Sequence, residues 1–228
     1  MASISKENLA FLQLLGKNNN RDWFHAHKSE YVKHHENAIA FADSVLEKMN
    51  GHDNIETLSG KKSLFRIYRD VRFSKDKSPY KTHWGGELNR ATKQLRGGYY
   101  FHIQPGGQSF VGGGFWAPNK DDLFRIREEI ASDAEELRAI INSKEIQTTF
   151  GALYGEQLKT APKGFDKDHP DIDLLRFKQF VFIKKFSDEE VLEAQFDAVV
   201  NETFKKLRPF LDLMSDVLTT DSNGSPLF

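Results

Sequence analysis

The 228-residue chain contains no cysteine. Disulfides, thiolate nucleophiles and cysteine-ligated zinc or iron–sulfur sites are therefore excluded, and the absence fits a reducing compartment. Long hydrophobic runs are also missing, because no stretch approaches the ~18 apolar residues that span a bilayer. The N-terminal sequence MASISKENLAFLQLLGKNNNR lacks the basic start and continuous apolar run of a secretory signal. These absences predict a cytoplasmic protein with no membrane partner.

The chain also lacks an excess of charge of either sign. It has 32 basic and 33 acidic residues, a net charge of −1, so any electrostatic function must come from local clustering. Hydrophobic residues at 39% and charged residues at 29% are typical of a globular protein. Because no linker, repeat or low-complexity tract divides the sequence, we expect one domain over residues 1–228.

Hydrophobic spacing predicts an α+β fold, with an antiparallel or mixed sheet of short strands packed against N-terminal, central and C-terminal helices. Helical spacing is found at 5–16, 20–49, 119–149 and 187–218. Strand patterns are found at 64–73, 98–104, 108–116 and 176–186.

Local signals refine these elements. Ser5 and Asn20 are expected to cap the first two helices, and Ser187 has Glu190 at capping-box spacing. Pro105-Gly106-Gly107 between two aromatic-rich runs predicts a β-hairpin. Three glycines at 112–114 indicate a bulge or a close approach of two backbones.

The most unusual segment is basic. Residues 61–81 hold eight cations and two acids, a local excess of six charges in a nearly neutral chain. If 64–73 is a strand, Arg66 and Arg72 lie on its polar face, whereas Arg69 interrupts the apolar face. An arginine buried there needs either a protein carboxylate or a ligand, because an unpaired buried charge is costly. The pattern leaves two alternatives open, an anion site and a solvated sheet face balanced by acids.

Guanidinium and ammonium groups bind phosphate and carboxylate, so the candidate ligand-binding set centres on this segment. Strand residues that can face the same side, and a cation from the rigid loop 159–165, complete it. The set is Arg66, Arg69, Asp70, Arg72, Lys75, Lys77, Tyr80, Lys81, His102, Trp116 and Lys163.

No familiar catalytic or metal motif is present. The sequence has no G-x-S-x-G elbow, kinase set or dinucleotide fingerprint, so it assigns neither catalytic residues nor a cofactor. The histidines of 20–49 lack a pair one turn apart, and the acidic run 166–173 lacks the glycine and final glutamate of a calcium loop. We therefore predict no metal site.

Five blocks occur together, in order, over nearly the whole chain. They are NNNRDWFHAHKSEY at 18–31, RIYRDVRFSKDKSPYKTH at 66–83, GGYYFHIQPGG at 97–107, VGGGFWAP at 111–118 and LKTAPKGFDKDHPDIDLLRFKQF at 158–180. In this combination the chain resembles the bacterial uncharacterised family catalogued as domain of unknown function 2461. The resemblance implies a full-length single-domain protein and brings no activity, cofactor or catalytic residue.

Three functions follow from the residues. The first is binding of an anionic ligand, a phosphate-bearing small molecule or nucleic acid, through the basic segment. The second is a hydrolase or transferase acting on a phosphorylated or carboxylated substrate, with Asp70 or His102 as general base. The third is a structural or interaction protein whose cations form internal salt bridges. The sequence leaves the oligomeric state open.

Overall fold

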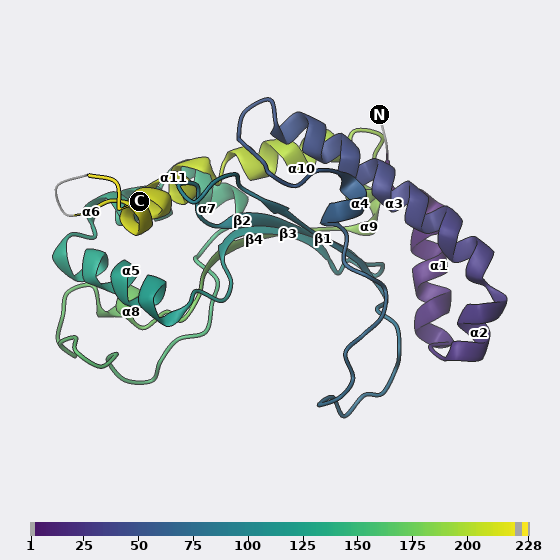
Figure 1. The fold of residues 1–228 in the computed structure, drawn as a ribbon, viewed down its shortest axis with the longest axis horizontal. Helices are drawn as coiled ribbons and strands as arrows, with labels where there is room; N and C mark the ends of the chain where they lie inside the picture. Colours follow the sequence, from purple (N-terminus) through teal and green to yellow (C-terminus); the bar gives the residue numbers. More distant parts are fainter. Residues whose placement is uncertain (1–2, 222–224, 228) are drawn as a thin grey trace. The chain divides into compact units, whose positions relative to one another are not determined.

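The computed structural model describes residues 3–221 and 225–227, and Figure 1 traces the elements in chain order. The N-terminal helices are α1 (Lys6–Lys17), α2 (Arg21–Ala26), α3 (Lys28–Met49) and α4 (Gly60–Ser63). The strands are β1 (Trp84–Asn89), β2 (Gly98–Ile103), β3 (Ser109–Phe115) and β4 (Phe180–Phe186). The central helices are α5 (Lys120–Ser132), α6 (Glu135–Ile141), α7 (Lys144–Thr149) and α8 (Ile172–Leu175). The C-terminal helices are α9 (Asp188–Val191), α10 (Phe196–Lys205) and α11 (Arg208–Thr219).

The strands form one antiparallel sheet in the order β1-β2-β3-β4, which confirms the predicted α+β class. The chain groups into two compact units, and the strands contribute residues to both. The first unit comprises Met1–Leu88, Tyr100–Val111 and Lys185–Glu202; the second comprises Asn89–Tyr99, Gly112–Lys184 and Thr203–Phe228.

The core of the first unit is built on one face of α3. Phe41 is fully buried, meets Phe101 of β2 edge to face at 5.7 Å between ring centroids, and stacks on Phe196 of α10 at the same distance. A buried polar contact joins the same two helices, since Lys48 Nζ lies 2.8 Å from the carboxylate of Asp197. Aromatic packing and this ion pair thus fix α3 against β2 and α10.

The second unit buries aromatic side chains in the same way. Phe182 of β4 meets Phe210 of α11 edge to face at 5.1 Å between ring centroids. Within this unit Arg90 is fully buried and pairs with Asp212 of α11. A buried guanidinium is tolerated here because it has a carboxylate partner.

Most of the predicted local signals are confirmed. The side chains of Ser5 and Asn20 accept hydrogen bonds from the first turns of α1 and α2, and Ser187 with Glu190 forms a complete capping box. The hairpin around 105–107 joins β2 to β3. The glycines at 112–114 serve a close approach, because a Cβ on Gly114 would overlap the carbonyl oxygen of Phe180 in β4.

The expected long helices are wrong in extent. The helix predicted at 20–49 is divided at His27 into α2 and α3, and the one at 119–149 is divided into α5, α6 and α7. The one at 187–218 is divided into α9, α10 and α11, with Pro209 in the first turn of α11. A proline there needs no N–H partner, so it starts a helix instead of kinking one.

Candidate functional site

The basic arm, defined as residues 66–81, belongs to the first unit. Figure 1 shows it as a long loop that extends away from the helices and strands of that unit. Its two limbs run antiparallel near the root, where Arg69 N donates to Pro79 O at 2.9 Å and Lys81 N donates to Ile67 O at 2.7 Å. Tyr68 and Tyr80 form an isolated bridge between the limbs. The arm is therefore an irregular hairpin.

The predicted strand at 64–73 is wrong. The segment makes isolated bridges at Leu64 and Tyr68 but no continuous ladder, and of its supposed apolar face only Ile67 is buried. Phe65 is 44% exposed and Phe73 is 97% exposed. The alternation of apolar and polar residues misled the prediction because a strand also needs a partner along its length, and the chain turns after Arg69.

The root of the arm is anchored in the core of the first unit. Tyr80 is buried and stacks on Phe24 of α2 at 4.0 Å between ring centroids. The main chain of Tyr80 also exchanges two hydrogen bonds with the side-chain amide of Asn19. Tyr80 is a predicted ligand-binding residue, but its ring is packed in the core, where it anchors the arm.

The two acids of the arm shape its turns. Asp70 accepts hydrogen bonds from the main chain and the guanidinium of Arg72, and these bonds lower the pKa of Asp70. Asp76 accepts from the main chain and hydroxyl of Ser78 and, at 2.5 Å, from Arg69. The bonds from Ser78 and Arg69 hold the pKa of Asp76 well below its usual value. Both carboxylates form Asx turns as well as ion pairs.

Arg69 has a partner within the protein. Its side chain is only 28% exposed, and its partner is a protein carboxylate, that of Asp76. Arg72 is likewise paired, with Asp70, at a site where both side chains are mostly exposed.

The arm nevertheless keeps a large positive charge. Its six cations and two carboxylates give a net charge of +4, whereas the whole chain carries −1. Lys77 and Lys81 donate to main-chain carbonyl oxygens, which leaves their charges uncompensated. Among the described residues, the side chains of Arg66 and Lys75 form no ion pair and no hydrogen bond. Exposed cations without a partner favour anionic ligands.

Next to the root of the arm, the sheet of the first unit carries a row of stacked rings. His102 of β2 lies between His83 at 4.0 Å and Phe110 of β3 at 4.7 Å, measured between ring centroids. His102 also contacts the hydroxyl of Tyr100 at 3.2 Å and the amide oxygen of Gln104 at 2.7 Å.

Burial keeps the two imidazoles of this row neutral. It lowers the pKa of His83 to about 3, with smaller effects from His102 and Lys81, and it also lowers the pKa of His102. Burial raises the pKa of Tyr100 to about 12. A row of neutral imidazole and phenol groups can stack and form hydrogen bonds with a ligand, but it adds no charge to the site.

The row and the arm are joined through Phe65. The ring of Phe65 lies 6.2 Å from that of Tyr100, and Phe65 N donates to Gly85 O at 2.9 Å. Lys81 Nζ lies over the ring of Phe65 at 5.6 Å. Asp70 and His102, the two candidate general bases, each have other hydrogen-bond partners, Arg72 and Gln104, and the described structure pairs neither with the other.

Two predicted site residues belong to the second unit. Trp116 is 55% exposed and stacks on Tyr154 at 6.0 Å between ring centroids. Lys163 is exposed in the loop that precedes α8. Both residues thus belong to a different unit from the basic arm, which is part of the first unit.

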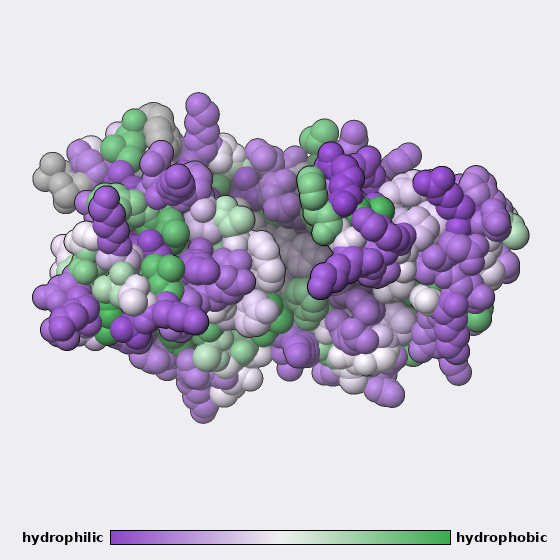
Figure 2. Space-filling model, turned by 90° about the horizontal axis from the view of Figure 1, so that it is seen from below, coloured by the Kyte–Doolittle hydropathy of each residue, from purple (hydrophilic) through white to green (hydrophobic). Residues whose placement is uncertain are grey.

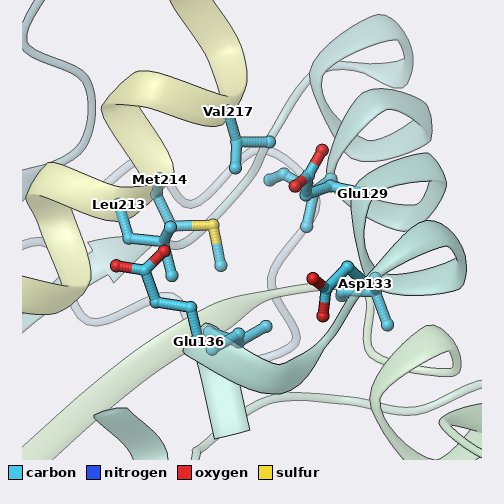
Figure 3. Close-up of a pocket in the computed structure, with 9 residues that line it drawn as sticks. Glu129, Asp133, Glu136, Leu213, Met214 and Val217 are labelled. Carbon is cyan, nitrogen blue, oxygen red and sulfur yellow. The ribbon is translucent and has the colours of Figure 1, made fainter. Parts of the chain in front are cut away.

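The second unit also contains a depression between α5, α6 and α11. Figure 3 shows Leu213, Met214 and Val217 of α11 facing the carboxylates of Glu129 and its neighbours Asp133 and Glu136. Its volume of about 60 Å³ has room for roughly two water molecules, whereas small-molecule sites span some hundreds of Å³. Its acidic rim also repels anions, so it does not serve the ligand class that the sequence predicts.

Sequence reasoning missed Phe65, Phe73 and His83 as site residues. The strand pattern at 64–73 places Phe65 and Phe73 on its apolar face, which predicts that they are buried. The local signal for Phe73 is its place between cations, with Arg72 immediately before it and Lys75 two residues after it. His83 carries no comparable signal, because only the fold brings it to His102.

Comparison with known families gives a match over most of the chain. Residues 7–213 match the family described as conserved hypothetical protein, DUF2461. The chain belongs to this family. No curated protein and no solved structure matches it. Membership in DUF2461 agrees with the resemblance of the five sequence blocks.

Two further observations concern the hydropathy of the surface and of the helices. Figure 2 shows that the side seen from below is mostly hydrophilic, with separate hydrophobic patches between the polar residues. Within residues 3–221 and 225–227, no helix combines the length and the apolar character that crossing a bilayer requires.

Proposed function

We propose that this DUF2461 protein binds a phosphate-bearing ligand at the basic arm. The observation that carries the proposal is the net charge of +4 on an exposed hairpin, in a chain whose net charge as a whole is −1. Arg66 and Lys75 are free to contact phosphate, and Lys77 and Lys81 add positive charge beside them. Clustered cations of this kind attract and orient anions.

The internal ion pairs support a second candidate function. Arg69 and Arg72 each have a carboxylate partner, as a purely structural or interaction role for the arm requires. In both pairs the carboxylate is mostly exposed, so the pairs contribute little to stability. They explain the turns of the arm, but within the described part of the chain they leave four of its six cations without a carboxylate partner in an ion pair. We therefore rank ligand binding first. The geometry of the described residues assigns no catalytic group.

A binding measurement with matched variants tests the proposal. Short-chain inorganic polyphosphate is titrated into the wild type and into Arg66→Glu/Lys75→Glu by isothermal titration calorimetry. The control is Lys6→Glu/Lys33→Glu, which makes the same change in charge at exposed positions of α1 and α3 in the same unit. We expect the arm variant to lose binding and the control to keep it. Equal binding by the two variants would favour the structural role.

A cytoplasmic location is part of the proposal. The absence of cysteine fits a reducing compartment, and phosphate-bearing ligands are abundant there. Fractionation of cells that express the full chain, followed by detection with an antibody, checks the location. Recovery of the protein outside the cytoplasmic fraction would contradict it.

A further inference from the structure

The basic arm and the residue before it expose aromatic rings as well as cations. Phe65, Tyr68 and Phe73 are 44%, 52% and 97% exposed. Exposed large aromatic side chains are costly to leave in water, so three of them on one short hairpin need an explanation. Along the sequence each is followed or preceded by an arginine, at positions 66, 69 and 72.

The three rings have different surroundings and are therefore separate contact points. Phe65 lies at the root, against Tyr100 and under Lys81. Tyr68 lies further along the arm, tilted against Phe24 and Tyr80.

At the tip, Phe73 is in contact with its neighbour Arg72, whose guanidinium lies 5.9 Å from the ring centroid. The face of this exposed ring that Arg72 does not cover is accessible to a ligand. A ligand that meets all three rings must extend along the arm.

From this arrangement we infer that the ligand of the basic arm is single-stranded nucleic acid, whose bases stack on Phe73, Tyr68 and Phe65 while its phosphates contact the cations between them. The inference rests on the proposed function and names its ligand. Proteins that bind single strands without sequence preference combine a basic track with aromatic rings, since every base has a stacking face.

A duplex fits the arm less well. Its bases are stacked on one another inside the helix, so exposed protein rings cannot stack on them without opening the pairs. A mononucleotide offers only one base and cannot engage three rings in separate surroundings.

The neutral groups of the row at the root, Tyr100 and His102, would form hydrogen bonds with the base edges of a bound single strand.

Fluorescence anisotropy of the intact protein separates these possibilities. The probes are a fluorescein-labelled single-stranded oligonucleotide of mixed sequence, as DNA and as RNA, and a labelled duplex of the same sequence. Unlabelled polyphosphate serves as competitor. The test variant is Phe73→Ala, whose side chain is 97% exposed and contributes nothing to the core. The control is Phe124→Ala, an exposed phenylalanine of α5 in the second unit.

We expect the single strand to bind more tightly than the duplex. Phe73→Ala should weaken single-strand binding by about 5-fold to about 150-fold, the range for loss of one stacked base, and leave polyphosphate binding unchanged. Phe124→Ala should behave as the wild type.

Other results overturn the inference in distinguishable ways. Equal affinity for single strand and duplex, with no effect of Phe73→Ala, would leave an electrostatic phosphate site and remove the single-strand assignment. Binding to vesicles that contain phosphatidylserine, dependent on Phe73 and without oligonucleotide binding, would replace nucleic acid by a lipid surface. Failure of both oligonucleotide and polyphosphate to bind would remove the proposed function as well.

Discussion

The guanidinium of Arg69 lies 2.5 Å from the carboxylate of Asp76, a residue of the same arm on the far side of its turn. This pair links the two limbs of the arm, and the main chain of Ser78 donates to the same carboxylate in an Asx turn. Arg69 is thus a residue that shapes the site, whereas Arg66 is available to a ligand.

Alanine substitutions should separate these two roles. Arg66→Ala should reduce polyphosphate affinity more than Arg69→Ala, because Arg69 must share its charge with Asp76 and Arg66 has no such partner. Asp76→Asn should keep or increase affinity, since it raises the net charge of the arm. Calorimetric titration of the three variants measures the order. A greater reduction for Arg69→Ala would mean that its ion pair opens when the ligand binds.

The buried ion pair of the first unit should be important for stability. Asp197 is almost fully buried and has Lys48 and Ser44 as partners. Lys48→Met leaves a buried carboxylate with the Ser44 hydroxyl and the Ala198 N–H as donors but no cation, so we expect a decrease of about 2 to 4 kcal/mol in the free energy of unfolding. Urea denaturation measures it, with Lys6→Met at an exposed position of α1 as control.

The Lys48–Asp197 pair also predicts that the stability of the fold depends on pH in the acidic range. Burial alone would raise the pKa of Asp197, but the bonds from Lys48 and Ser44 outweigh it and lower that pKa. A carboxylate with a lowered pKa stabilises the fold above its unfolded pKa of about 4, and this stabilisation is lost as the pH falls below that value. Asp197→Asn should therefore show a weaker decline in melting temperature in this range than the wild type.

His83 should make the protein sensitive to milder acid. Burial lowers its pKa to about 3, whereas the unfolded chain binds the proton near pH ~6.5. Stability should therefore decrease as the pH falls from about 6.5 towards about 3. His83→Phe keeps an aromatic ring beside His102 and should flatten this decrease, as measured by melting temperature against pH. The exposed control His25→Phe should keep the wild-type dependence of melting temperature on pH. If His83→Phe also kept it, the lowered pKa of His83 would be contradicted.

Two glycines distinguish conformational strain from steric clash. Gly107 has a φ of 67° with open space around it, so Gly107→Ala should cost about 1 to 2 kcal/mol. Gly114 has a φ of 131°, and a Cβ there would also overlap the main chain of β4. Gly114→Ala should therefore destabilise the protein more than Gly107→Ala. Chemical denaturation of both variants gives the comparison, and similar effects would contradict it.

Features that depend on neighbours in sequence could be predicted. Ser5 and Asn20 cap helices because a short polar side chain can reach the first turn, and the β2–β3 turn follows from a proline and two glycines. The α+β class follows from the spacing of apolar residues. These signals are local, so the sequence is sufficient to find them.

Features that depend on distant partners could not be predicted. β1 includes Gly85 and Gly86, a residue type that is depleted in strands, and it exists because β2 pairs with it. Tyr80 was assigned to the ligand because it lies in the basic segment, but Phe24 draws its ring into the core. Arg69 pairs with Asp76 because the chain turns between the two residues and brings Asp76 beside Arg69. The strand predicted at 64–73 excluded such a turn.

The salt dependence of binding tests most directly whether the cations of the arm contact nucleic acid. The logarithm of the association constant for the single-stranded oligonucleotide is measured against the logarithm of salt concentration, for the wild type and Arg66→Ala/Lys75→Ala. We expect the slope to become shallower by about 1.4, which is about 0.7 for each phosphate that the variant no longer neutralises on a single strand. The same slope for both proteins would mean that Arg66 and Lys75 do not contact phosphate, and would contradict binding through the basic arm.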